Sequence, residues 1–516
     1  MTGPSAIAAD LGAAPLRRAR PAIRNAARIV IVGAGIGLVG QLLLYGVGVG
    51  INAPILVVLL LGAGWVLRRP LRRPMLRDLW LAPASVVFAG FAAVRADPNL
   101  VGLDLLTALV LAGAALASFG GSAVVARPIR SLLRLMVRTL EWVVSGAAKA
   151  ISAARRRLPP GLGRGRARLG LPVLRGLLIA VPVVIVFVSL FAAADAIFAR
   201  MLEDLVRVDL ELGDLTGRLL LAAVIGWMAI GGLALAASRG GIPATDERPI
   251  PWRLGHTEAL TVVLAVDATF LGFVALQGAY LFGGLDTMQA VGMTYSDYAR
   301  RGFFELVTVA ALAGALVVAC DQLIVRRSMA WLASSIGLVV LTGAVLASAA
   351  MRLRLYQEAY GWTELRLYVI ATIIVLAVSL AALIVGLATD RVRWIGHVIV
   401  AATLGAGLAL NVIGPVRFIT EQNVARAFDP GLVPENGNDG LDAFYLASLG
   451  DDAVPALVLA LPVITGDEGD FLRTDLRFRL QALQEDDALS AWQAWNAGRT
   501  AAREALEGAA REGLLD

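Results

Sequence analysis

The stretch RLRLYQEAYGWTELRLY, residues Arg352–Tyr368, lies between two apolar runs, Trp331–Met351 and Leu365–Leu387. Each run is about as long as a helix must be to cross the hydrocarbon core of a bilayer, which is ~30 Å thick. Gly361 is placed to end the first helix, and Thr363 is placed to cap the start of the second. Tyrosines and a tryptophan accompany the charges, as is typical of a membrane interface. The stretch therefore predicts two membrane helices joined by a short turn at the membrane surface.

Similar apolar runs recur along most of the 516-residue chain, which is 58% hydrophobic and 17% charged. Soluble domains carry about a quarter charged residues. The eleven predicted spans are Ile29–Tyr45, Pro54–Leu67, Leu79–Val94, Leu103–Gly120, Leu174–Ala194, Leu219–Ala237, Leu260–Phe282, Phe303–Ile324, Trp331–Met351, Leu365–Leu387 and Trp394–Val412. The ~10-residue alternating segments of membrane β-barrels are not seen in the sequence. The predicted fold is an all-α, polytopic transmembrane helical bundle.

The distribution of charge predicts the orientation of this bundle. Residues 1–413 hold 38 basic and 22 acidic residues, a net charge of +16, whereas residues 414–516 hold 8 basic and 18 acidic residues, a net charge of −10. Arginines cluster after every second span, and cytoplasmic loops carry such clusters. The N-terminus is therefore predicted inside and the C-terminal tail outside. An even number of spans would put the tail inside, and the first two runs are the hardest to separate.

The sequence divides into five predicted regions. They are a cytoplasmic tail (1–28), four spans (29–126), a basic amphipathic cytoplasmic segment with a linker (127–173), a seven-span core (174–413) and a small extracytoplasmic α-helical domain (414–516). Of the 46 basic residues, 45 are arginine, which favours a GC-rich bacterial genome. The predicted location is therefore the bacterial cell membrane.

The basic segment from Arg127 to Arg157 has arginines at helical spacing, with leucines between them. Such a helix is expected to lie in the inner interface with its arginines on anionic lipid headgroups. The alternative is an exposed helix that acts only as an orientation signal.

Several classes of site are not expected in this chain. The single cysteine, Cys320, excludes an intrachain disulfide, and two histidines cannot make a multi-histidine metal site. The sequence has no nucleotide-binding loop, zinc motif or nucleophile elbow. We therefore predict no catalytic residues, cofactor or metal. Because the positive charge lies between apolar runs, we do not predict nucleic-acid binding.

Three segments on the predicted outer side each combine a carboxylate with arginines, against the positive-inside trend. The residues are Asp195 and Arg200, then Arg300, Arg301 and Glu305, and finally Arg352, Arg354, Glu358, Glu364 and Arg366. If these segments meet, they form a charged outward-facing cavity. Two interpretations stay open at this point: a structural charge network, or a site for an anion or a lipid headgroup.

Asp267 lies seven residues inside a predicted span, and Gln277 lies ten residues further along. An ionisable side chain at such depth is costly and marks a candidate functional site. A proton- or cation-coupled carrier could use Asp267. The alternative is a hydrogen bond between helices that holds the bundle together.

Some segments carry a resemblance to a known family. YLFGG (Tyr280–Gly284), YARRGFFELV (Tyr298–Val307) and the opening stretch resemble segments of a bacterial membrane-protein family, domain of unknown function 4173, which is akin to the 4153 group. ADAIFAR (Ala194–Arg200) and YLASLGDDAVPAL (Tyr445–Leu457) are also similar to its members. The resemblance covers roughly residues 180–500. It implies a multi-spanning integral membrane protein and supplies no activity or catalytic residues.

Three functional hypotheses follow from the sequence. The first is a non-enzymatic membrane protein that acts through lipids, or through a protein partner at the tail. The second is a secondary transporter of a small anionic solute or lipid headgroup. The third is a lipid-linked transferase that uses the outer carboxylates Asp195, Glu305, Glu358 or Glu364.

Overall fold

The computed structural model describes residues 25–68, 73–156, 211–238, 253–282, 303–433 and 440–515, together with Val184, Asp195 and Met201. Within these residues every regular element is a helix, and Leu254 and Ile324 form an isolated β-bridge. The prediction of an all-α fold is therefore confirmed for the part of the chain that the structure describes.

Two groups of helices contain the apolar runs. The first helix group consists of α1 (Ala26–Leu44), α2 (Asn52–Leu67), α3 (Leu81–Gly90), α4 (Pro98–Phe119), α5 (Ile129–Arg155) and α8 (Glu211–Ala236), with short 3-10 helices at Arg73–Asp78 and Phe91–Ala93. The second helix group consists of α9 (His256–Phe282), α12 (Phe303–Leu323), α13 (Met329–Tyr360), α14 (Glu364–Ala388) and α15 (Ile395–Ile413), with a 3-10 helix at Val392–Trp394.

Within the described ranges, nine helices are long and apolar enough to cross a membrane, and α2 is a shorter apolar helix. Ten of the eleven predicted runs thus correspond to helices of the structure. The remaining run, Leu174–Ala194, lies outside the described residues apart from Val184. These findings support a multi-pass membrane protein.

The turn predicted by the opening stretch is confirmed. Helix α13 continues nine residues beyond Met351 and ends at Gly361, whose φ of 78° is a conformation that glycine adopts without strain. The Thr363 hydroxyl then accepts a hydrogen bond from the Arg366 backbone N–H and caps α14. Both helix ends therefore follow from local sequence signals.

The last part of the chain forms a third body, which we call the tail. Its helices are α16 (Pro415–Phe428), α17 (Ala443–Ser448), α18 (Val454–Ala460), α19 (Asp467–Glu485), α20 (Asp487–Ser490) and α21 (Ala497–Arg511), with 3-10 helices at Pro430–Leu432, Asp451–Ala453 and Trp492–Ala494. Leucines of the tail share a core with Leu100 of α4, Leu367 of α14 and Leu410 of α15. The tail is therefore continuous with the ends of both helix groups.

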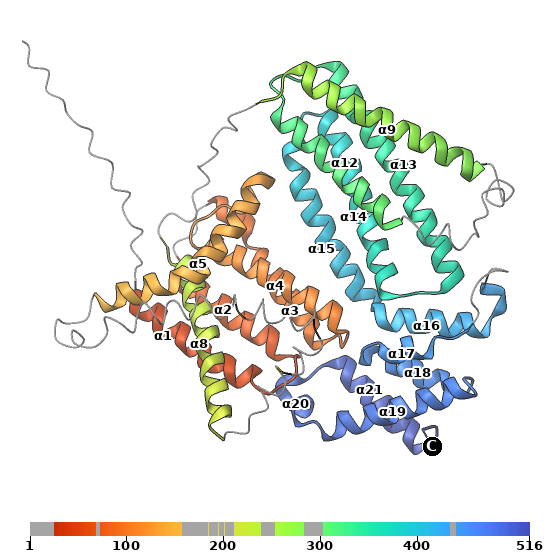
Figure 1. The fold of residues 1–516 in the computed structure, drawn as a ribbon. Helices are drawn as coiled ribbons and strands as arrows, with labels where there is room; N and C mark the ends of the chain where they lie inside the picture. The colour runs from red at the N-terminus through yellow and green to blue at the C-terminus, as the bar shows by residue number, and fades with distance from the viewer. Residues whose placement is uncertain are drawn as a thin grey trace, which may run out of the picture.

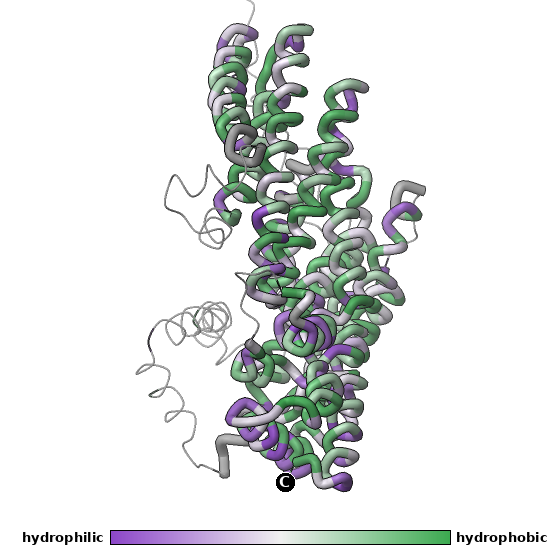
Figure 2. Tube along the Cα trace, turned by 90° about the vertical axis from the view of Figure 1, so that its right-hand side faces the viewer, coloured by the Kyte–Doolittle hydropathy of each residue, from purple (hydrophilic) through white to green (hydrophobic). Residues whose placement is uncertain are grey.

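Figure 1 shows the two helix groups beside each other, with the tail, in blue, across one end of both. Hydrophobic residues predominate along the long helices, and hydrophilic residues concentrate in the tail and at helix ends (Figure 2). The arginine-bearing turns at Arg326–Arg327 and Arg391–Arg393 follow α12 and α14, whose other ends lie toward the tail. The tail and these basic turns are thus at opposite ends of the second group.

Helix α5 packs against α8, where Trp227 donates a hydrogen bond to the Val144 carbonyl over 2.9 Å. Ala147 and Ala150 are buried, whereas Val137 and Leu140 are exposed. Arg138 pairs with Glu141 at 3.0 Å. Helix α5 therefore buries one face against other helices of the first group and presents an apolar and charged face outward.

Close packing of α1 on α8 depends on a glycine. A Cβ atom added to Gly37 would lie 2.4 Å from the Ala222 carbonyl oxygen, whereas one added to Gly35 would have no neighbour within 4 Å. Small residues at helix contacts let membrane helices approach closely. Gly37 is therefore one of the residues that set the distance between α1 and α8, with Gly33, whose added Cβ would lie 2.4 Å from Ile230 Cγ1.

We predict that Gly37→Ala lowers the free energy of unfolding by about 1–3 kcal/mol, because the backbones must move apart. Gly35→Ala on the same helix is the matched control. It should leave stability unchanged or raise it, because alanine favours helix. Thermal melting of the detergent-solubilised protein, followed by tryptophan fluorescence, measures both. Equal melting temperatures for the two variants would contradict the packing argument.

Candidate functional site

A buried carboxylate joins the two helix groups near the end that carries the tail. Asp104 of α4 and Asn411 of α15 are each 1% exposed, and the Asn411 amide donates to Asp104 Oδ1 over 2.9 Å. Asp104 Oδ2 is also buried, and it has no hydrogen-bond partner in the described structure. Asp104 lies six residues after Pro98, the first residue of α4, or ~9 Å along the helix. We call the boundary between the two helix groups, which contains the Asp104–Asn411 pair, the seam.

Further polar groups cross the seam between Asp104 and the tail. Asp97 caps α4 by accepting hydrogen bonds from two backbone N–H groups, and Tyr368 of α14 donates its hydroxyl to Asp97 over 3.3 Å. Asn99 donates to Glu364 over 3.2 Å. Burial raises the pKa of Asp97 above its usual value, although its cap hydrogen bonds act in the opposite direction. The seam thus gathers three carboxyl groups and a phenol.

Arginines at the seam bind the carbonyl groups at helix ends. Arg95 donates to the Asn411 carbonyl at the end of α15. Arg366 donates to the carbonyls of Tyr360 and Gly361 at the end of α13, and its guanidinium lies 4.0 Å from the Tyr356 ring centroid. The last carbonyls of a helix have no partner within the helix and carry partial negative charge. These arginines therefore cap helix C-termini.

Arg426 of the tail completes the cap on α13. It donates to the carbonyls of Gln357 at 3.1 Å, Glu358 at 2.6 Å and Ala359 at 2.8 Å. Beside it, Asn423 both accepts from the Trp362 N–H at 2.7 Å and donates to the Trp362 carbonyl at 2.9 Å. Helix α16 is thereby fixed to the turn that joins α13 and α14.

We predict that Arg426→Met lowers the free energy of unfolding by about 1–3 kcal/mol, because buried carbonyls lose their donors. The matched control is Arg417→Met on the same helix. Arg417 is exposed and pairs only with Glu421, one turn away, so its loss should change stability by less than about 0.5 kcal/mol. Melting curves in detergent compare the two variants. An equal loss of stability in both would show that the carbonyl cap is unimportant.

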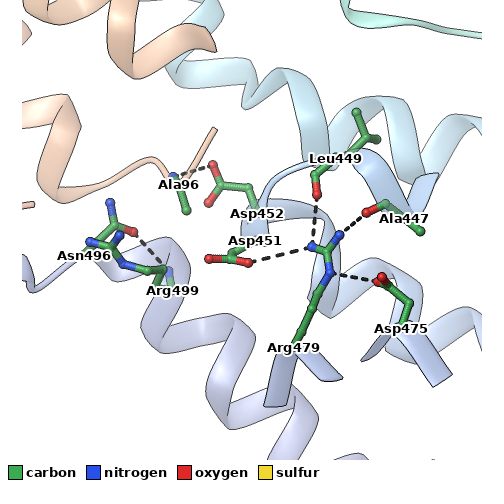
Figure 3. Close-up of polar contacts among 9 residues, drawn as sticks. All are labelled: Ala96, Ala447, Leu449, Asp451, Asp452, Asp475, Arg479, Asn496 and Arg499. Atoms are coloured by element: carbon green, nitrogen blue, oxygen red, sulfur yellow. Dashed lines mark hydrogen bonds and ion pairs between the residues drawn. The ribbon is translucent and has the colours of Figure 1, made fainter. Parts of the chain in front are cut away.

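The tail also binds the first helix group (Figure 3). Asp452 accepts a hydrogen bond from the Ala96 N–H over 2.9 Å, and Asn496 donates to the carbonyls of Ala92 and Arg95 at 2.8 and 2.6 Å. Within the tail, Arg479 donates to the Leu449 carbonyl at 3.0 Å. The tail therefore holds the ends of both helix groups in one arrangement.

Two aspartates at this contact, Asp451 and Asp452, have pKa values above the usual value of 3.8. Burial raises the pKa of Asp451 although Arg479 and Arg499 oppose the shift, and burial likewise raises the pKa of Asp452. A raised pKa means that the folded protein holds these protons more tightly than the unfolded chain does. The resulting stabilisation is complete below the ordinary value of 3.8 and is lost as the pH rises through the raised values.

We therefore predict that the tail and its contact with the first helix group are more stable at pH 4 than at pH 8. Hydrogen exchange of residues 440–515, corrected for the intrinsic pH dependence of exchange, should show greater protection at pH 4. Asp452→Asn should reduce the difference, because the amide keeps an acceptor for the Ala96 N–H but does not titrate. Protection that is the same at both pH values in the wild-type protein would refute the prediction.

The predicted outer charged residues have varied surroundings. Arg354 pairs with Glu358 at 2.8 Å on the exposed face of α13, and Arg352 is half-buried on the same helix. Glu305 is exposed in the first turn of α12. Asp195 is also exposed. Arg200, Arg300 and Arg301 lie outside the described residues. Among the members of the predicted set that the structure describes, Glu364 and Arg366 lie at the seam.

The two predicted intramembrane residues both lie on α9. The Ser334 hydroxyl of α13 donates to Asp267 Oδ2, while Asp267 Oδ1 is buried and lacks a hydrogen-bond partner in the described structure. Gln277 is 6% exposed, and its amide nitrogen also lacks a partner there. Asp267 therefore makes an interhelical hydrogen bond and keeps one oxygen atom available.

Sequence reasoning missed Asp97, Asp104 and Asn411. The Asp97–Pro98 pair is a signal for a helix start, because aspartate is a good N-cap and proline is favoured in the first turn. This signal would have moved the start of the fourth span from Leu103 to Pro98 and placed Asp104 more than one turn inside the helix rather than at its second residue. Asn411 has no comparable local signal.

The described residues contain no group of three or more His, Cys, Asp or Glu side chains placed to hold a metal ion. The seam carboxylates are spread along the boundary and are bound by amides and a phenol. Their arrangement suits the binding and release of protons more than the coordination of a metal.

The comparison with protein families gives a match over residues 82–460, to the family described as Domain of unknown function (DUF4153). No curated protein and no solved structure matches the chain. The match includes α4, α14 and α15, which form the seam, and much of the tail. It is to the 4153 group, whereas the sequence had pointed first to the related 4173 family. Because the match covers more than half of the sequence, the chain belongs to the DUF4153 family of domains of unknown function.

Proposed function

We propose that this protein is a non-enzymatic membrane carrier that couples the movement of a small solute to a proton bound at Asp104. The single observation that carries this proposal is the buried Asp104–Asn411 contact between the two helix groups. An ionisable side chain at this depth in a membrane helix is costly to keep and is characteristic of proton pathways.

The partner of Asp104 supports exchange of a proton. Asn411 is neutral, so it cannot offset the charge of an ionised Asp104, and Asp104 Oδ2 has no donor in the described structure. An unpaired buried charge is strongly unfavourable. Binding a proton removes the charge, and separation of the helix groups along the seam would expose the group to water for release. The bond across the seam would then depend on the protonation state.

Groups between Asp104 and the tail give the proton a route. Asp97, Tyr368 and Glu364 lie in this region and can accept or donate protons. Arg95 and Arg366 are already engaged with backbone carbonyls. The charge at the seam therefore favours a cationic solute over the anionic one that the sequence suggested.

The proposal includes an orientation in the bacterial cell membrane, with the N-terminus inside and the tail outside. It is supported by the basic turns at Arg326–Arg327 and Arg391–Arg393, which lie at the end opposite the tail. The arginines near the tail include Arg95, Arg366 and Arg426, which are used as helix caps.

We predict that Asp104→Asn abolishes solute-dependent proton flux. Purified protein is reconstituted into liposomes that contain a pH-sensitive dye, and a panel of inorganic cations, amines and basic amino acids is added. Wild-type protein should change the internal pH with at least one solute. Asp104→Asn should reduce this flux at least about tenfold, the factor that corresponds to 1.4 kcal/mol.

The control is Asp487→Asn, which makes the same change in charge at an exposed position of the tail. It should transport like the wild type. The carrier proposal fails if Asp104→Asn keeps normal flux, or if the folded wild-type protein moves no protons with any member of the panel.

A second role is supported by the outer surface of the tail. Phe444 is 71% exposed and stacks on Phe471 with ring centroids 4.2 Å apart. Exposed aromatic residues are typical anchors at protein interfaces. We propose this face as the place where a protein partner would bind, in addition to the carrier role.

A further inference from the structure

A groove lies at the end of the second helix group opposite the tail. It has a volume of about 740 Å³ and is formed by the last turns of α14, the 3-10 helix that follows and the start of α15. Ala382 and Val385 line it from α14, and Ile395 and Val398 line it from α15. Its walls are therefore aliphatic.

The chain forms this groove by turning sharply. The Arg391 N–H donates to the Gly386 carbonyl over 2.7 Å, and a Cβ atom on Gly386 would lie 3.3 Å from Val392 Cα. Glycine thus allows the turn to approach α14. The turn places Thr389, Arg391 and Trp394 at the groove beside its apolar walls.

The mouth of the groove is positively charged. Arg391 and Arg393 are both exposed. The nearby carboxylate, Asp390, is bound by Arg327, which also binds Asp321 at 2.7 Å. Arg327 binds both carboxylates and offsets one of their two charges. With Arg391 and Arg393, these five side chains carry a net charge of +1, which favours an anion at the mouth of the groove.

The surroundings of the groove indicate where its occupant comes from. Only 28% of the most apolar 18-residue stretch of α14 and 22% of that of α15 are buried, so both helices keep accessible apolar surface. Trp394 is 57% exposed, and tryptophan is enriched at the level of lipid headgroups. An apolar groove with an arginine and an exposed tryptophan at its mouth matches the two parts of a lipid.

We propose that this groove binds an anionic phospholipid from the leaflet opposite the tail. One acyl chain lies against Val385, Ile395 and Val398, and the headgroup phosphate lies at Arg391, with Arg393 nearby. Arginine suits this role because its planar guanidinium can donate two hydrogen bonds to a phosphate. This site is separate from α5, where the sequence predicted lipid contacts, and from the seam.

Native mass spectrometry of the purified full-length protein tests the proposal. The protein is exchanged into detergent with phosphatidylglycerol or with phosphatidylcholine of identical acyl chains. Wild-type protein should retain one more lipid molecule in the phosphatidylglycerol sample than in the phosphatidylcholine sample. Arg391→Gln should weaken retention of phosphatidylglycerol about fivefold, because one arginine near anionic lipid contributes about 1 kcal/mol. Arg391→Lys should restore part of the retention.

Two further variants separate the groove from the charge. Ala382→Phe fills the groove and should abolish the additional phosphatidylglycerol, while Arg354→Gln removes an exposed arginine at the opposite end and should have no effect. Melting curves confirm that each variant is folded, and Ala382→Leu replaces Ala382→Phe if the larger residue prevents folding. Equal retention of the two lipids, or unchanged retention in Arg391→Gln, would overturn the proposal. If the wild-type protein forms a dimer and Ala382→Phe abolishes it, the groove binds a second copy of the chain instead of a lipid.

Discussion

Carbonyl groups at the C-terminal ends of helices must find donors, and arginine side chains supply them at the ends of α13, α15 and α17. A helix leaves its last four carbonyls without internal partners. Where such an end is covered by other parts of the protein, water cannot replace the missing donors, and the cost is several kcal/mol for groups in a membrane. Arg426 and Arg366 serve α13, Arg95 serves α15, and Arg479 serves α17 in the same way.

This constraint explains why the tail and the helix groups form one structure. Arg426 and Asn423 bind the turn after α13, whereas Asn496 and Asp452 bind the chain between α3 and α4. The tail thus satisfies backbone groups on both sides of the seam. Among the residues that the structure describes, few polar pairs join the two helix groups directly. The tail therefore helps to hold the two groups in a fixed position relative to each other. The same connection limits how the groups can move, which matters for any carrier that opens at the seam.

The seam and the groove place two kinds of chemistry at opposite ends of the second helix group. At the tail end, carboxyl groups on α4 and α14 are held by amides and a phenol, an arrangement that responds to protons. At the other end, Arg391 lines an aliphatic groove and Arg393 is exposed nearby, an arrangement that suits the proposed anionic lipid. A lipid bound between the ends of α14 and α15 would stabilise one relative position of these helices. Since Asn411 lies on α15, the proposed lipid and the proposed proton would act on the same helix.

The sequence by itself determined the membrane helices and the turn between α13 and α14. Length and hydropathy are properties of a continuous segment, and Gly361 and Thr363 act on residues within one helical turn. The sequence also identified Asp267 as a candidate for a hydrogen bond between helices, although it did not identify the partner, Ser334. Glu364 and Arg366 were recognised as important, but their roles were not, because charge alone does not distinguish a ligand site from a helix cap.

Only the tertiary structure decided the site. Asp104 and Asn411 are 307 positions apart in the chain, and Arg426 is 67 positions from the Ala359 carbonyl that it caps. Asn411 is a single amide in an apolar run, and its significance depends wholly on what faces it across the seam. Burial and hydrogen-bond partners arise from packing between helices, which local patterns of residues do not encode.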